Sequence, residues 1–195
     1  MADRTGRPLR GGFFFSRIRG PAAVAGVAAA VIVSTAVGLS IVRPRTPLLV
    51  WNASPSSPVG LYAVTSGSGV RVGDMVVAWP PPAYRRMAAA RSYLPFHVPL
   101  VKRVAAVAGD RVCARRERIL VNGRPAGLRR MRDPSGRTMP WWSGCRRLRP
   151  GELFLLSTAG PLAFDGRYFG VTGASELVGR ARLLWPSPSR SASND

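Results

Sequence analysis

The stretch "VPLVKRVAAVAGD" (residues 98–110) is an apolar run that ends in a Gly-Asp turn, a pattern typical of a buried β-strand. Lys102 interrupts this run, and it is the only lysine in a chain with 29 basic residues. Burial penalises the charged form of an amine, so a lysine in such a strand can lose its proton, whereas an arginine stays charged. The stretch therefore predicts a buried strand that carries either a general base or a lysine whose amine reaches the surface from the strand edge.

Apolar runs rich in Val, Leu and aromatic residues alternate with Gly, Pro, Ser and Asn turns along much of the remaining chain, which predicts a mainly β domain. The Asn-Gly pair at residues 122–123 indicates a hairpin. Residues 83–94 have a helical pattern, and residues 111–149, rich in arginine, are expected to form a basic surface subdomain or a long loop. The expected strands are residues 48–53, 60–66, 74–80, 99–107, 118–123, 152–158 and 177–185.

Residues 21–42 carry no charged side chain, and as a helix with a rise of about 1.5 Å per residue they are long enough to cross a bilayer. Five arginines precede this segment and only two follow it closely. The positive-inside rule therefore predicts a single-pass inner-membrane protein with residues 1–20 in the cytoplasm and a domain, residues 46–186, in the periplasm. A cleavable signal peptide is the alternative, and it exports the same domain. Residues 187–195 have the composition of a disordered tail.

Cys113 and Cys145 are the only cysteines, and in an exported domain they predict a disulfide that closes the basic segment. Two separate buried thiols are the alternative. A single histidine and the lack of a Cys-x-x-Cys pair argue against a metal site, and no cofactor is expected. The net charge of +20 suggests nucleic acid or a membrane as a partner. Because the predicted anchor exports the domain, we expect the membrane and not nucleic acid.

A serine-rich turn, "NASPSSPVGLY" (residues 52–62), lies between two expected strands. A neutral lysine amine can take the proton of a serine hydroxyl, so this turn together with Lys102 predicts a Ser/Lys dyad. The segment "FDGRYFG" (residues 164–170) adds Asp165 and Arg167, which can form an ion pair that fixes a loop beside a site. Each feature alone also has a structural explanation, namely a Ser-Pro turn, a lysine that reaches the surface and a salt bridge at a turn.

The order of these segments resembles the signal peptidase I superfamily and, within it, the TraF-type conjugal-transfer peptidases. The TraF-type pattern N-x-S/T-x-S-x-P-x-G-L-Y is similar to residues 52–62, and "KRVAAVAGD", "GCRRLRPGELFLL" and "FDGRYFG" fit as well. The resemblance implies a signal-peptidase-like β domain and a membrane-anchored serine endopeptidase. Its partners would be an exported pilin or preprotein substrate and a conjugative transfer apparatus. In the TraF type, the substrate's own amine can resolve the acyl-enzyme and give a cyclic pilin.

The resemblance implies that Ser56 is the nucleophile, with Ser57 as the nearest alternative, and that Lys102 is the general base. Ser54 falls where a hydroxyl helps the backbone N–H of the nucleophile to bind the oxyanion. Asp165 and Arg167 would form the box that shapes the site.

Two positions depart from the family pattern. Ala163 stands where the family often has a serine that hydrogen-bonds the lysine, and Ser157 or Thr158 is the candidate replacement for that hydroxyl. Gly166 replaces the serine of the family's Asp-Ser-Arg box. The alternative functions are a general type I signal peptidase and a non-catalytic, Arg-rich, membrane-tethered module that binds polyanions. A weaker third idea makes His97 the base of a triad.

Overall fold

The computed structural model describes residues 21–42 and 49–187, which belong to two separate units. In the first unit, helix α1 (Pro21–Val42) covers the uncharged segment. Across the described residues, no helix has both the length and the apolar character needed to cross a membrane. The predictions for residues 1–20, and for the tail from residue 188 onward, lie outside the described residues.

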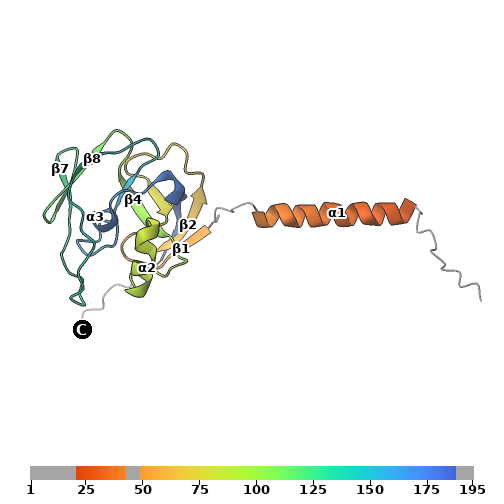
Figure 1. The fold of residues 1–195 in the computed structure, drawn as a ribbon, viewed down its shortest axis with the longest axis horizontal. Helices are drawn as coiled ribbons and strands as arrows, with labels where there is room; N and C mark the ends of the chain where they lie inside the picture. Colours follow the sequence, from red (N-terminus) through yellow and green to blue (C-terminus); the bar gives the residue numbers. More distant parts are fainter. Residues whose placement is uncertain (1–20, 43–48, 188–195) are drawn as a thin grey trace, which may run out of the picture. The chain divides into compact units, whose positions relative to one another are not determined.

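The second unit is built on a six-stranded sheet of order β1-β2-β10-β3-β4-β9, in which neighbouring strands are antiparallel (Figure 1). All six strands fall at expected strand segments, so the mainly β fold is confirmed. Strand β4 pairs with β3 on one side and with β9 on the other, which buries the stretch around Lys102. The strands are β1 (Leu49–Asn52), β2 (Gly60–Thr65), β3 (Met75–Ala78), β4 (Leu100–Ala106), β9 (Phe154–Leu156) and β10 (Leu177–Pro186).

A second, four-stranded sheet of order β7-β6-β5-β8 forms from the basic segment. In Figure 1 its strands β7 and β8 lie on the side of the domain away from β1 and β2. Residues 111–149 are thus a subdomain with a sheet and not a long loop, and only β6 was expected as a strand. The strands are β5 (Arg111–Arg115), β6 (Arg118–Val121), β7 (Arg124–Leu128) and β8 (Gly144–Arg147).

Two features expected from the sequence, a hairpin turn and a disulfide, join strands of this small sheet. Asn122 and Gly123 both have positive φ, 50° and 80°, as the two-residue turn of the β6–β7 hairpin requires. Cys113 and Cys145 lie directly opposite each other in the β5–β8 pair, and their sulfur atoms form a disulfide.

The helices of the second unit are short. Helix α2 (Pro82–Ala90) ends four residues before the expected limit, and Ser92 just beyond it has a positive φ of 58°. Helix α3 (Gly166–Phe169) and the 3₁₀ turn η1 (Ala174–Glu176) were not expected from the sequence. Ala88 of α2 and Phe169 of α3 belong to one hydrophobic cluster with Leu100 of β4, which places the "FDGRYFG" segment beside the large sheet.

We predict that loss of the disulfide destabilises the second unit without changing its fold. The bond joins residues with a sequence separation of 32, and a chain-entropy estimate for such a loop is about 3–4 kcal/mol. The free energy of unfolding of the double variant Cys113→Ser/Cys145→Ser should fall by that order. Alkylation of the non-reduced protein should label neither cysteine, and labelling of both would contradict the bridge.

Candidate active site

Ser56 and Lys102 meet although they are 46 positions apart in the sequence. The Ser56 side chain comes from the turn between β1 and β2, and Lys102 comes from the middle of β4. Lys102 Nζ is hydrogen-bonded to Ser56 Oγ. Ser56 is partly exposed, whereas the lysine is only 3% exposed. The arrangement presents a serine hydroxyl to solvent and keeps the amine behind it out of water.

The environment of Lys102 favours the neutral amine. Burial lowers the pKa of Lys102 from 10.5 to about 8, an effect that Arg167 reinforces and the charge of Asp165 opposes. Among the residues that the structure describes, Ser56 is the one hydrogen-bond partner of this amine. A lysine that titrates near neutral pH and touches a serine hydroxyl can accept that hydroxyl's proton.

The other two serines of the turn have different surroundings. Ser54 Oγ lies 2.8 Å from Ser56 Oγ and accepts a hydrogen bond from Ser56 N at 3.3 Å. Ser57 is buried, and its hydroxyl donates to Val101 O at 2.7 Å. The structure therefore brings Ser54 and Ser56 together with Lys102 and directs Ser57 elsewhere.

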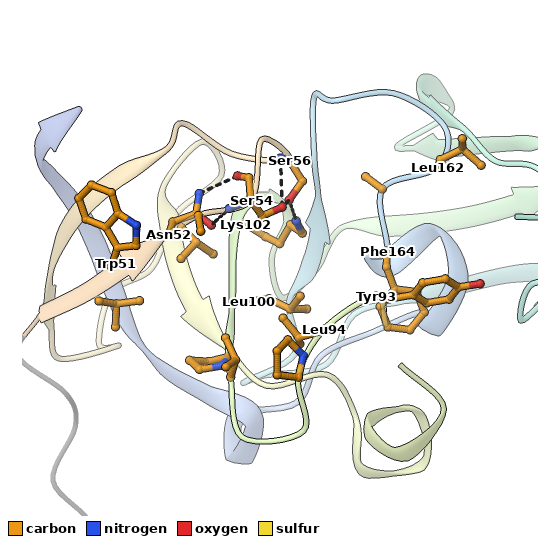
Figure 2. Close-up of a pocket in the computed structure, with 17 residues that line it drawn as sticks. Trp51, Asn52, Ser54, Ser56, Tyr93, Leu94, Leu100, Lys102, Leu162 and Phe164 are labelled. Carbon is orange, nitrogen blue, oxygen red and sulfur yellow. Dashed lines mark hydrogen bonds between the residues drawn. The ribbon is translucent and has the colours of Figure 1, made fainter. Parts of the chain in front are cut away.

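Asn52 holds the serine turn, a role that the sequence did not indicate. Its Nδ2 donates to the carbonyl oxygens of Ser54, Ser57 and Pro58 at 2.9, 3.2 and 3.0 Å. Its Oδ1 accepts from Ser54 N at 3.2 Å, and Figure 2 shows this side chain next to Ser54 and Ser56. Asn52 is the last residue of β1 and is 8% exposed. Its hydrogen bonds to the serine turn, called the Asn52 clamp below, are therefore anchored in the large sheet.

Asp165 and Arg167 form a buried ion pair with 2.8 Å between Oδ1 and Nε. The carboxylate also accepts from Arg167 N at 3.1 Å and Ser157 N at 2.7 Å. Burial raises the pKa of Asp165, and Arg167 and the two backbone N–H groups oppose that rise. Arg167 Nη2 in turn donates to Ser157 O at 2.7 Å, so the pair fixes the chain just after β9.

The hydroxyl of Ser157 is hydrogen-bonded to the backbone of Ser56 and not to the lysine. Ser157 Oγ donates to Ser56 O and accepts from Ala159 N at 3.0 Å. In the described part of the chain, neither Ser157 nor Thr158 is hydrogen-bonded to Lys102, so the candidate replacement for the lysine-orienting serine was wrong. Asp165 thus holds the backbone of Ser157, and the hydroxyl of Ser157 holds the backbone carbonyl of Ser56, so these contacts support the serine turn.

The glycine at position 166 has a steric reason. A Cβ atom there would lie 2.8 Å from Leu155 O and 2.9 Å from the ring of Phe154, closer than side chains normally approach. The serine of the family pattern therefore does not fit at Gly166 in this packing.

A cleft with a volume of about 630 Å³ opens beside the Ser56–Lys102 pair. Figure 2 shows the serine turn and Lys102 together at one part of the cleft, and Tyr93 and Phe164 beside each other at another. Most of its lining is apolar, which suits an extended peptide with apolar side chains. The lining residues are Val50, Trp51, Asn52, Ala53, Ser54, Ser56, Tyr93, Leu94, Pro95, Val98, Pro99, Leu100, Val101, Lys102, Leu162, Ala163 and Phe164.

His97 lies apart from the serine turn in the structure. It is exposed, and its ring contacts Phe96 edge-on at 4.9 Å between centroids. The residue is not part of the cleft lining, so the geometry does not support a triad with Ser56.

We predict that Asn52→Asp destabilises the serine turn, because a carboxylate oxygen would face three carbonyl oxygens without a proton to donate. An unmade buried hydrogen bond costs about 1–3 kcal/mol, so the free energy of unfolding should fall by at least that order. Chemical denaturation measures it, with Ser135→Ala as a neutral control, since Ser135 is exposed. Equal stability of Asn52→Asp and the wild type would contradict the Asn52 clamp.

Comparison with known proteins identifies the family. Residues 21–186 match the family described as signal peptidase, peptidase S26. The conjugal transfer protein TraF of Agrobacterium fabrum (strain C58 / ATCC 33970) is 36% identical over 144 residues, which cover 69% of this chain and 80% of the relative. A plasmid transfer protein TraF of Escherichia coli is 34% identical over 146 residues, which cover 69% and 82%.

Among solved structures, a signal peptidase I from Enterococcus faecalis V583 aligns with 62% of this chain and all of its own. The sequence identity is 16% and the TM-score is 0.35, so the overall similarity to that structure is low. The sequence relatives confirm the resemblance to TraF-type proteins, and the chain belongs to the signal peptidase family, peptidase S26.

Proposed function

We propose that this protein is a serine endopeptidase with a Ser56/Lys102 dyad. The observation that carries the proposal is the hydrogen bond between Ser56 Oγ and the amine of Lys102, a residue that is 3% exposed and whose pKa is lowered by burial to about 8. A nucleophile with an adjacent base of suitable pKa, open to a peptide-sized cleft, is the arrangement that acyl transfer needs.

The reaction follows from these contacts. Ser56 Oγ attacks the scissile carbonyl carbon while the neutral amine of Lys102 takes the hydroxyl proton. The Ser54 hydroxyl and the backbone N–H of Ser56 stabilise the oxyanion by donating hydrogen bonds to it. For this, the N–H of Ser56 exchanges its present acceptor, Ser54 Oγ, for the oxygen of the substrate. Collapse of the intermediate breaks the peptide bond, and Lys102 returns the proton to the leaving amine. A second nucleophile, either water or an amine of the substrate, then releases the acyl group from Ser56.

The proposed substrate is an exported precursor, and a pilin matured for conjugative DNA transfer is the specific candidate. The support is the similarity to relatives that are named conjugal transfer and plasmid transfer proteins. A general signal peptidase would use the same dyad. Mass spectrometry of a co-expressed pilin precursor, with wild type and with Ser56→Ala, tests both the dyad and the proposed substrate. A precursor that is processed equally in both cases would overturn the dyad, and one that stays intact with wild type would overturn this substrate.

We predict that Lys102→Arg is as inactive as Lys102→Ala, because a guanidinium does not give up its proton near neutral pH. The amine accepts a proton only when it is deprotonated, so the wild-type rate should rise with pH, with a midpoint at about 8. Rates of acyl-enzyme formation measured from pH 6 to 10 would show this. The neighbouring Arg103 is exposed and offers a matched control, since Arg103→Lys should keep the activity. An active Lys102→Arg would refute the dyad.

We further propose that a segment that includes the uncharged residues 21–42 anchors the protein in the cytoplasmic membrane, with the second unit in the periplasm, although helix α1 as described does not itself meet the requirements for crossing a membrane. The support is the uncharged length of residues 21–42 and the excess of arginine on its N-terminal side. The disulfide between Cys113 and Cys145 is consistent with an oxidising compartment.

The topology predicts the behaviour of reporter fusions. An alkaline phosphatase fused after Asp195 should be active, because it folds only in the periplasm, and a cytoplasm-only reporter at the same position should be silent. The opposite pattern would place the second unit in the cytoplasm.

A further inference from the structure

A loop of the basic subdomain touches the wall of the cleft. Residues 129–139 follow β7 and run to the end of α2, where they meet Arg91 and Tyr93. The Tyr93 hydroxyl donates to Asp133 Oδ2 at 2.5 Å, across 40 positions of sequence. This contact joins a segment that carries none of the dyad residues to a residue that lines the cleft.

Asp133 is held as a buried anion at the centre of this contact. It is 6% exposed, and Arg137 donates to it twice, from Nε at 2.6 Å and from the backbone N at 2.8 Å. Burial raises the pKa of Asp133, but the hydrogen bonds from Tyr93 and Arg137 outweigh it and lower the pKa to about 2. The carboxylate is therefore charged at every physiological pH and is a strong acceptor for the tyrosine hydroxyl.

Further contacts fix the same loop against the end of α2. Arg91 Nη1 donates to Thr138 O at 2.7 Å, and Arg137 Nη2 donates to Arg91 O at 3.3 Å. Met139 is buried in the hydrophobic cluster that also contains Leu100 and Phe164. Both polar and apolar contacts thus hold the loop against the end of α2.

Tyr93 transmits this contact to the cleft. Its ring packs against Phe164 with 5.4 Å between centroids, and Tyr93, Leu94, Leu100 and Phe164 all line the cleft. Figure 2 shows Tyr93 and Phe164 side by side, away from Ser56 and Lys102. A change in how Tyr93 sits would therefore alter the shape of the wall without touching the reacting atoms.

We propose that Asp133 is a positioning residue that sets substrate specificity: through Tyr93, the basic subdomain fixes the wall against which the substrate's apolar groups pack. This rests on the proposed peptidase function, because it assigns a role within the same cleft. The contrasting role is a salt bridge that stabilises the fold and leaves the fit of the acyl group unchanged.

Two p-nitrophenyl esters separate these roles. Ser56 Oγ forms an ester with the acyl group, p-nitrophenolate leaves, and the serine proton passes to Lys102. The acetate is too small to reach the wall, whereas the octanoate must place its chain in the cleft. The test variants are Tyr93→Phe, which keeps the ring but removes the donor, and Asp133→Asn, which keeps the shape but removes the charge. Tyr84→Phe is the matched control, because its ring belongs to the same cluster but does not line the cleft.

The ratio of the octanoate to the acetate acylation rate should fall about three-fold or more in both test variants. The loss in the double variant should be smaller than the sum of the two single losses, because both single variants remove the contact between Tyr93 and Asp133. Tyr84→Phe should keep the wild-type ratio. An unchanged ratio in folded Tyr93→Phe would overturn the proposal, as would an equal loss with both esters. Failure of the peptidase function gives a different result, since the nitrophenolate burst would then persist in Ser56→Ala or be missing from the wild type.

Discussion

The burial of one amine is the constraint on which the site depends. Lys102 lies in β4 between β3 and β9, and a charged amine there is costly because water cannot reach it. The fold supplies limited compensation, since the carboxylate of Asp165 is paired with Arg167, whose charge acts in the opposite direction. The lysine can therefore exist with and without its proton, which an exposed lysine does not do near neutral pH.

Arg167 connects the two sheets around this amine. Besides the ion pair with Asp165, its guanidinium donates to Ser157 O at the end of β9 and to Leu128 O at the end of β7 at 3.1 Å. Arg129, the residue after Leu128, donates back to Arg167 O at 3.3 Å. The same guanidinium thus fixes the loop behind Ser56 and joins the large sheet to the small one. The small sheet is part of the site's support, and the contact of Asp133 with Tyr93 extends that support to the cleft wall.

The sequence revealed the parts of the fold and site whose signals are local. Strands of the large sheet are apolar runs between turns, and Lys102 was conspicuous because every other basic residue is arginine. Strands β5, β7 and β8 were missed because arginines on their exposed faces, with Gly and Pro among them, hide the alternation of a strand. The Asn52 clamp and the contact of Tyr93 with Asp133 depend on side-chain directions and on residues far apart in the chain, which no local pattern encodes.

The contrast between Lys102 and Arg129, another deeply buried cation, explains why the single lysine stands where it does. Arg129 is 1% exposed and has no carboxylate partner among the described residues, yet its planar group donates to the carbonyls of Arg116, Trp142 and Arg167 and lies 3.6 Å from the centre of the Trp141 ring. Such a fork of donors keeps a charge satisfied inside a protein, so burial there serves structure. Lys102 has one described hydrogen-bond partner, the Ser56 hydroxyl, so its charge is poorly satisfied and its proton is easily lost. An arginine in β4 would keep its charge and its donors, and Ser56 would then lie beside a permanent cation instead of an amine that can lose its proton.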